Sequence, residues 1–208
     1  MPVAYELKSR RGGWDAIDQA TGFFMSDHPV KRSLRKVTAR LDELQIPYAV
    51  VGGMALVAHG YERTTTDVDL LVTAEGLKAI HAALDGLGYV PPFAGSKHLR
   101  DAETGVRIEF LVAGQYPGDG VPKPVAFPDP AKVAIDLGGS KVIALERLIE
   151  LKLASGMTNL GRLKDLGDVQ ELIRVLTLEA DFATRLDESV RGKFLELLQG
   201  VKADRSDH

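Results

Sequence analysis

The stretch Tyr48–Val72 reads YAVVGGMALVAHGYERTTTDVDLLV, and its alternation of apolar and polar segments decides the fold. The apolar run that opens it breaks at Gly52-Gly53, and a short helical pattern and a polar loop follow. A second apolar run then carries Asp67-Val68-Asp69. This order predicts a strand, a glycine turn, a helix, a loop and a strand that bears two carboxylates.

The two aspartates of the second strand are expected to project from the same face. Residues two apart on a strand lie roughly 6.5 to 7 Å apart along the chain, so Asp67 and Asp69 point together while Val68 and Leu70 face a core. Two neighbouring acids repel each other, and such a pair is suited to a hard cation such as Mg²⁺, which prefers oxygen ligands. The pair therefore predicts a metal site.

The glycines between the first strand and the helix add a complementary feature. Without a Cβ atom, Gly52-Gly53 lets a phosphate approach the backbone, and the free N–H groups at a helix start favour an anion. A cation site and a phosphate site are thus predicted on consecutive strands.

These motifs resemble those of the nucleotidyltransferase superfamily related to DNA polymerase β. Gly52-Gly53 is followed by Asp67-Val68-Asp69 with 13 residues between Gly53 and Asp67, and a third acid, Glu109, lies in a later apolar segment. The third acid is glutamate where many relatives have aspartate. The resemblance implies an α+β fold, a mixed sheet flanked by helices with a C-terminal helical part.

The same resemblance implies a reaction and roles for individual residues. Asp67, Asp69 and Glu109 would be catalytic and would bind two Mg²⁺ ions, with Mn²⁺ as a substitute, and Glu109 would accept the acceptor's proton. The residues implied to bind the nucleotide are Gly52, Gly53, Arg63, Thr66 and Lys152. The implied reaction is transfer of NMP from an NTP, for example ATP, to a hydroxyl with release of pyrophosphate.

A second resemblance covers residues 144–172, ALERLIELKLASGMTNLGRLKDLGDVQEL. This segment resembles the helical part of the bacterial AbiEii-like toxin nucleotidyltransferases, in which a lysine helix precedes an Arg-x-Lys-Asp-x-x-Asp element. The supporting residues carried over are Arg162, Lys164, Asp165 and Asp168. The toxin group implies an antitoxin partner, and an acceptor that is tRNA or another RNA, or a protein.

Other interpretations of the same residues stay open. The acceptor could instead be a small molecule, as in antibiotic nucleotidyltransferases, or the chain could bind nucleotide without turnover. Glu109 could form a structural ion pair with Arg107, and Arg63 could bond to Asp67. Lys152 could pair with Asp165 or Asp168 of the next helix, and Asp168 could instead pair with Lys164.

Hydrophobic periodicity predicts the remaining elements. Apolar residues at steps of three or four predict helices over residues 30–44, 75–87, 142–155, 162–176 and 188–198. Two short strands are predicted over residues 98–101 and 106–112, and residues 113–132 form a long loop that is either a wall or lid of the site or a surface excursion. The predicted organisation is an extension (1–29), a nucleotidyltransferase core (30–140), a helical part (141–201) and a flexible tail (202–208).

Composition sets the broad class of protein. A 208-residue chain can bury a proper core, and the absence of cysteine excludes disulfides and thiolate metal sites. No apolar run reaches the roughly 20 residues of a membrane span, and no signal peptide is recognised, so a cytoplasmic location is expected. The net charge of −3 gives no global attraction for nucleic acid, although basic residues clustered within 31–40 could contact phosphates or simply be solvated.

Overall fold

The computed structural model describes residues 28–206. All but the last two residues of the predicted extension 1–29 therefore lie outside the described residues. The helices are α3 (Pro29–Glu43), α4 (Gly52–Ala58), α5 (Ala74–Leu84), α6 (Pro130–Val133), α7 (Leu145–Thr158), η1 (Leu160–Arg162), α8 (Leu163–Leu176), η2 (Ala180–Arg185) and α9 (Glu188–Ser206). The strands are β1 (Tyr48–Val50), β2 (Asp67–Val72), β3 (Tyr89–Val90), β4 (His98–Asp101), β5 (Arg107–Val112), β6 (Ala134–Leu137) and β7 (Ser140–Ile143).

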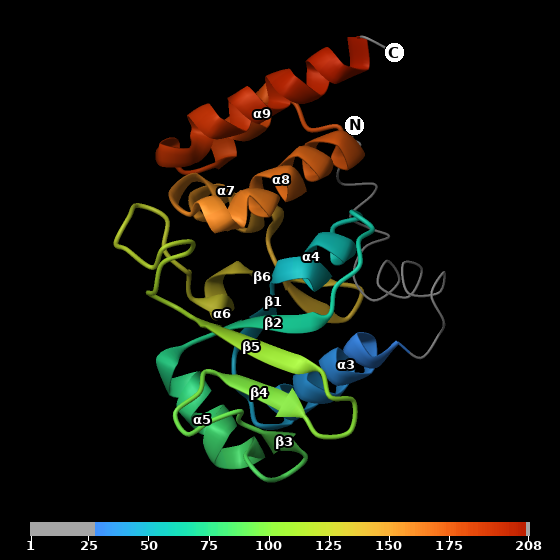
Figure 1. Cartoon of the computed structure of the whole chain (residues 1–208), viewed down its shortest axis with the longest axis vertical. Coiled ribbons are helices and arrows are strands. Elements are labelled where there is room, and N and C mark those ends of the chain that lie inside the picture. Colours follow the sequence, from blue (N-terminus) through green and yellow to red (C-terminus); the bar gives the residue numbers. More distant parts are fainter. Residues whose placement is uncertain (1–27, 207–208) are drawn as a thin grey trace.

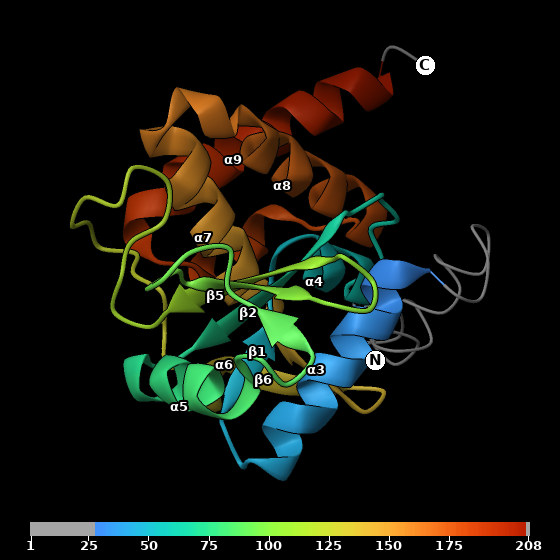
Figure 2. The same cartoon turned by 60° about the horizontal axis from the view of Figure 1, so that its bottom comes forward.

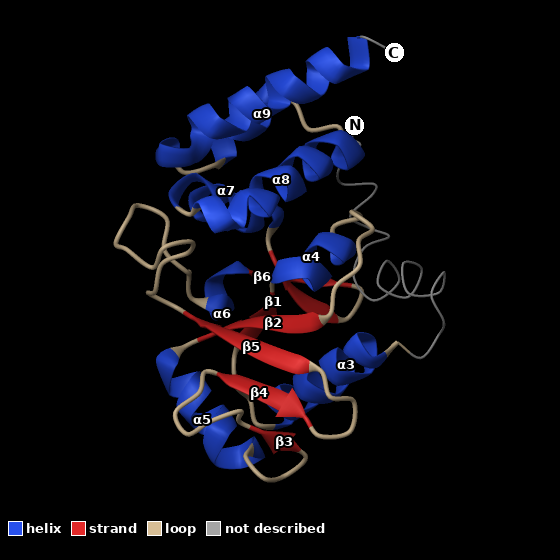
Figure 3. Cartoon of the chain, viewed as in Figure 1, coloured by secondary structure: helices blue, strands red, loops and turns tan. Residues whose placement is uncertain are grey.

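A mixed sheet forms the centre of the molecule, with helices on either side (Figure 3). Its strand order is β3-β4-β5-β2-β1-β7-β6. Strand β2 pairs antiparallel with β1 and parallel with β5, and the register sets Asp69 opposite Glu109. Strand β2 therefore lies in the middle of the sheet, and its two aspartates lie between strands β5 and β1.

The two faces of the sheet are covered by different helices (Figures 1 and 2). Helices α3 and α5 pack on one face, while α4 and then α7, α8 and α9 lie on the other. Val68, Leu70 and Val72 are fully buried, whereas Asp67 and Asp69 alternate with them and are half-buried. The predicted division of β2 into a core face and a carboxylate face is confirmed.

The basic residues of α3 lie away from those carboxylates, because α3 packs on the opposite face. Lys36 donates to Asp101 over 2.9 Å, and Arg40 pairs with Glu43 on its own helix. These two cations are therefore occupied by nearby acids.

The C-terminal helices form a layer of their own. Helix α8 packs against both α7 and α9, and the contact buries Ile149, Val169, Leu172 and Phe194 completely. The predicted helical C-terminal part is confirmed. Within residues 28–206, no helix combines the length and the apolar character that crossing a bilayer requires.

Strands β6 and β7 are a feature that the sequence analysis missed. The helix predicted from Val142 begins at Leu145, because Val142 and Ile143 belong to β7, which pairs with both β1 and β6. The hairpin turns at Gly138-Gly139, both with positive φ. The boundary predicted between residues 140 and 141 stays a prediction, and it falls inside β7.

Three smaller differences concern the ends and faces of helices. Helix α5 ends at Leu84, three residues before the predicted end, and Leu87 is 71% exposed. Leu163, an apolar residue of the predicted helix 162–176, is 56% exposed because it opens α8 at the rim of the helical layer. Helix α9 runs to Ser206, so most of the segment predicted as a flexible tail is helical.

Candidate active site

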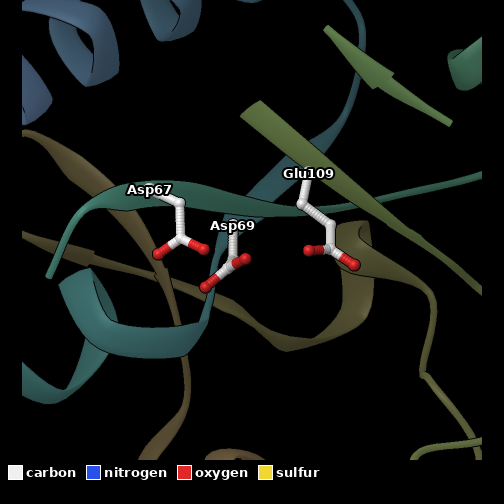
Figure 4. Close-up of side chains that lie close together, drawn as sticks. All are labelled: Asp67, Asp69 and Glu109. Carbon is white, nitrogen blue, oxygen red and sulfur yellow. The ribbon is translucent and has the colours of Figure 1, made fainter. Parts of the chain in front are cut away.

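Three carboxylates meet on the sheet face that α4 covers (Figure 4). Asp67 and Asp69 extend from β2 and Glu109 from the neighbouring β5, and one oxygen of each carboxylate lies within 4.8 Å of the others. The parallel register between β2 and β5 brings Glu109 beside Asp69, although 40 residues separate them in sequence. The structure thus brings the three predicted acids together.

The glycine turn before α4 fits tightly against this cluster. Gly52 has φ +61°, and a Cβ atom there would lie 1.8 Å from Oδ2 of Asp69. A Cβ atom on Gly53 would lie 2.7 Å from Oγ1 of Thr65. Glycine is required at Gly52 for two separate reasons, its left-handed backbone and the close approach of a carboxylate.

The threonines before β2 differ in position from what was predicted. Thr65 lines the cleft and its hydroxyl donates to Oδ1 of Asp67 over 3.2 Å. Thr66, the predicted nucleotide ligand, is exposed and is not among the residues that line the cleft.

Asp69 is electrostatically strained in the absence of a cation. Burial and the negative charges of Asp67 and Glu109 together raise its pKa to about 7, although Lys152 and Arg162 oppose the shift. A carboxyl group with such a pKa keeps its proton below about pH 7 unless a cation displaces it. The cluster is therefore suited to bind a divalent cation in place of a proton.

We expect the affinity of the site for Mn²⁺ to depend on pH because of Asp69. Its pKa is raised from 3.8 to about 7, so below pH 7 the cation must displace a proton, and affinity falls about tenfold per pH unit. Above about pH 8 the carboxylate is already ionised and affinity becomes constant. Titration of Mn²⁺ by electron paramagnetic resonance at several pH values measures this, and a constant affinity from about pH 5 to 8 would contradict it.

Glu109 also contacts a cation on its own strand. Nη2 of Arg107 lies 3.0 Å from Oε2 of Glu109 and 3.0 Å from Nε2 of His98. The predicted alternative of an Arg107–Glu109 ion pair is thus present. It engages one carboxylate oxygen, and the carboxylate still belongs to the three-acid cluster.

Lys152 reaches the cleft from α7 and is held by two acids of α8. Its Nζ donates to Oδ1 of Asp165 over 3.0 Å and to Oδ2 of Asp168 over 2.7 Å, all three side chains being buried. This confirms that Lys152 has partner acids on the next helix. Arg63, by contrast, pairs with Asp168 over 2.6 Å, so the alternative that it bonds to Asp67 is wrong.

Two further groups complete this buried network. Nε of Arg162 and the hydroxyl of Ser155 both donate to Oδ2 of Asp165, over 2.9 and 2.7 Å. Burial alone would raise the pKa of Asp165, but Lys152, Ser155 and Arg162 together lower it below its usual value. Lys164 also lines the cleft and is exposed, and no ion pair with Asp168 is found among the described residues.

The acids, the glycine turn and the cations surround one cleft of about 310 Å³. The sequence analysis missed part of its lining, which comes from the strand end and the long loop: Leu111, Tyr116, Pro117, Gly118 and Phe127. The loop has no alternation of polar and apolar residues from which its contribution to the cleft lining could be predicted.

Hydrogen bonds connect the loop after β5 to the end of α7. Nδ2 of Asn159 donates to the carbonyl of Gly118 over 3.2 Å. Nζ of Lys123 donates to the carbonyl of Pro117 over 2.7 Å and to Oγ1 of Thr158 over 3.0 Å. Of the two roles predicted for this loop, the structure supports a wall of the cleft.

Comparison with known proteins identifies the fold. No protein-family model and no curated protein matches the chain. Among solved structures, ANT(2")-Ia in complex with adenylyl-2"-tobramycin is 14% identical with a TM-score of 0.50, over 84% of this chain and 97% of that chain. The solution structure of the antibiotic-resistance factor ANT(2'')-Ia is 16% identical with a TM-score of 0.51, over 84% and 95%.

A third structure, an antigenic nucleotidyltransferase-like protein from Paracoccidioides brasiliensis, is 20% identical with a TM-score of 0.45, over 70% of this chain and 76% of that chain. At these identities the likeness to the two ANT(2'')-Ia structures establishes the fold alone. The fold is that of the nucleotidyltransferases, as the sequence motifs predicted.

Proposed function

We propose that this protein is a metal-dependent nucleotidyltransferase that moves NMP from an NTP to a hydroxyl acceptor and releases pyrophosphate. The observation that carries the proposal is the approach of Asp67, Asp69 and Glu109 to within 4.8 Å of one another, directly beside the Gly52-Gly53 turn. An acid cluster and a glycine turn in one cleft supply the two features that a nucleoside triphosphate with its cation needs.

The donor set of the cluster fits Mg²⁺. Three carboxylates offer only oxygen ligands, which hard cations prefer. Burial and the charges of Asp67 and Glu109 raise the pKa of Asp69 to about 7, so a cation would stabilise its ionised form. Asp67, Asp69 and Glu109 would hold the metal, with Mn²⁺ as a substitute. When bound, two such ions would neutralise phosphate charge and polarise the reacting oxygens.

The chain's own residues would then orient the reactants. The backbone at Gly52 and Gly53 would hold the β- and γ-phosphates, and Arg63 and Lys152 would balance the charge of the departing pyrophosphate. The acceptor oxygen bonds to the α-phosphorus as the bond from that phosphorus to the bridging oxygen breaks. Glu109 accepts the hydroxyl proton.

The supporting residues have a positioning role in this proposal. Asp165 and Asp168 hold Lys152 and Arg63 at the cleft, and Arg162 adds a further cation. Thr65 replaces Thr66 as the threonine suited to contact the nucleotide, because it lines the cleft. Lys164 is exposed at the same opening and is available to a phosphate.

The biological role that we propose is that of a toxin-like cytoplasmic enzyme, controlled by an antitoxin, that acts on tRNA or another RNA or on a protein. Its support is the resemblance of residues 144–172 to the AbiEii-like group. The alternative is a small cationic acceptor, and the similarity of the fold to that of ANT(2")-Ia supports it. Two acids of the long loop that could have favoured it are occupied, since Asp119 pairs with Lys123 and Asp129 caps α6.

The proposal is tested by incubating the protein with each α-labelled NTP, with Mg²⁺ or with EDTA, in the presence of total RNA, cell lysate or tobramycin. We expect label on an acceptor with at least one NTP, and only with Mg²⁺. Metal-dependent nucleotide binding without labelling of any acceptor would overturn the proposal and favour a non-catalytic nucleotide-binding protein.

A further inference from the structure

The sheet face that carries the acids continues beyond them onto β5 and β4. In the antiparallel register His98 lies opposite Glu109, and Arg100 lies opposite Arg107. In the parallel register Arg107 also lies beside Asp67. Because paired residues share a face, Asp67, Arg107 and Arg100 form a row that spans roughly 10 Å across three strands.

Along this row the side chains change from acidic to basic with distance from the three acids. The side chain of Arg107 is 47% exposed, and its Nη2 is occupied by Glu109 and His98, whereas Nη1 and Nε donate no hydrogen bond to the described residues. Arg100 is exposed, and its Nη1 donates to the carbonyl of Gly105 over 2.6 Å. Several guanidinium donors are therefore free.

Of the two arginines, Arg107 alone has a carboxylate partner among residues 28–206. Like charges directly opposite each other on neighbouring strands destabilise a sheet. Glu109 offsets Arg107, but within residues 28–206 no carboxylate pairs with Arg100. The nearest acid in sequence, Asp101, points to the other face, where Ser33 and Lys36 bind it. An external anion would remove this unfavourable charge pairing.

The surface extends toward the loop wall of the cleft. Lys97, just before β4, donates to the side chain of Gln115 over 2.8 Å. The residue after Gln115 is Tyr116, which lines the cleft together with Phe127. Cations that track a backbone, combined with aromatic side chains on which bases stack, are the two features of surfaces that bind single-stranded nucleic acid.

We propose that the β4–β5 surface, defined by Arg100 and Arg107, binds the phosphate backbone of a single-stranded nucleic acid whose terminal hydroxyl is the acceptor. This rests on the proposed function and specifies its acceptor. The hydroxyl would lie at Glu109 and the adjoining phosphate at the arginines. A small cationic antibiotic would be repelled by the same row.

The test measures binding separately from transfer. A short fluorescent single-stranded RNA, and DNA of the same sequence, are titrated with the full chain, with Arg100→Glu, with Arg100→Lys and with Lys78→Glu. Lys78 is an exposed lysine of α5, on the opposite face of the sheet, so its charge reversal is the matched control. Binding of Mn²⁺ is measured for each variant.

We expect Arg100→Glu to weaken oligonucleotide binding about tenfold or more, with Arg100→Lys recovering part of it and Lys78→Glu close to wild type. The slope of log affinity against log salt should fall by about 0.7 for the lost phosphate contact. Mn²⁺ binding should be retained by every variant, because the three acids are intact. Tighter binding of the RNA or of the DNA identifies which kind of strand the surface prefers.

Oligonucleotide binding that is absent, or unchanged in Arg100→Glu, would overturn the acceptor proposal. Transfer of label to tobramycin in preference to either strand would overturn it as well, while the proposed nucleotidyltransferase activity would stand. Conversely, Arg100-dependent binding without any transfer would refute the activity and leave the binding surface in place. The two proposals can therefore fail independently.

Discussion

Replacing Asp69 by asparagine is expected to lower nucleotide transfer by at least about 10³-fold, because a bound metal contributes several kcal/mol to charge stabilisation in the transition state. Asparagine has nearly the same shape but lacks the negative charge. Asp69 lies between Asp67 and Glu109, so its loss removes the central member of the cluster. The measurement is kcat/KM for transfer of label from the NTP that the wild-type protein uses.

The same substitution should not weaken the fold. The pKa of Asp69, raised to about 7 by burial and by the neighbouring acids, means that its ionised form is unfavourable in the metal-free protein. By linkage, an acid with a raised folded-state pKa lowers stability as pH rises from its ordinary value of 3.8 to about 7, so asparagine removes this loss above that range. We expect Tm of the metal-free variant at about pH 8 to be equal to or above that of wild type.

The control for this prediction is Asp181→Asn, which removes one exposed carboxylate of η2 far from the cluster along the chain. It should keep both transfer and Mn²⁺ binding. Retention of transfer by Asp69→Asn within about tenfold of wild type would show that the acid cluster is not the metal site of the reaction.

Replacing Gly52 by alanine is expected to reduce transfer by about 10²-fold or more, since a displacement of about 1 Å at a reacting centre has effects of this size. The added Cβ atom would lie 1.8 Å from Oδ2 of Asp69, so either the carboxylate or the turn must move. The residue must also hold φ +61°, which costs an L-amino acid about 1 to 2 kcal/mol. Mn²⁺ affinity should fall together with transfer.

Gly86→Ala separates the cost of a positive φ from the effect of the close contact with Asp69. Gly86 has φ +77°, and a Cβ atom there would meet nothing within 4 Å. Gly86→Ala should therefore lose only the free energy of unfolding that the positive φ costs, measured in urea, and Gly52→Ala should lose at least as much. Gly52→Ala alone should lose metal binding and transfer. Equal activity of the two variants would mean that the close contact between Gly52 and Asp69 is not needed for the site.

Much of the fold could be predicted because its signals are local. Helix α8 was predicted to begin within one residue of its actual start, since apolar residues recur along it at helical steps. Strand β2 was recognised by alternation of Asp67 and Asp69 with buried residues. The hairpin β6–β7 was missed because Val142 and Ile143 of β7 were assigned to the helix that follows them.

The candidate site was predictable only in part. The acids on β2 and the glycine turn are adjacent in sequence, and Glu109 stood out as a polar residue in an apolar strand. Tyr116 and Phe127 carry no such signal, because a proline-rich loop has no period from which a facing direction can be read. The buried network was only half predicted, since Arg63 and its partner Asp168 are 105 residues apart.

The sequence by itself determined the chemistry of this protein, namely which strand carries paired carboxylates, where glycine must precede a helix, and which helices present an apolar stripe. These depend on side-chain spacing within one element, which the period of a strand or helix dictates. Only the tertiary structure decided the partners: the approach of Gly52 to Asp69, the pairing of Arg63 with Asp168, and the row of Arg107 and Arg100 beside the acids. Those contacts depend on strand order and register, which are set by packing between elements distant in sequence.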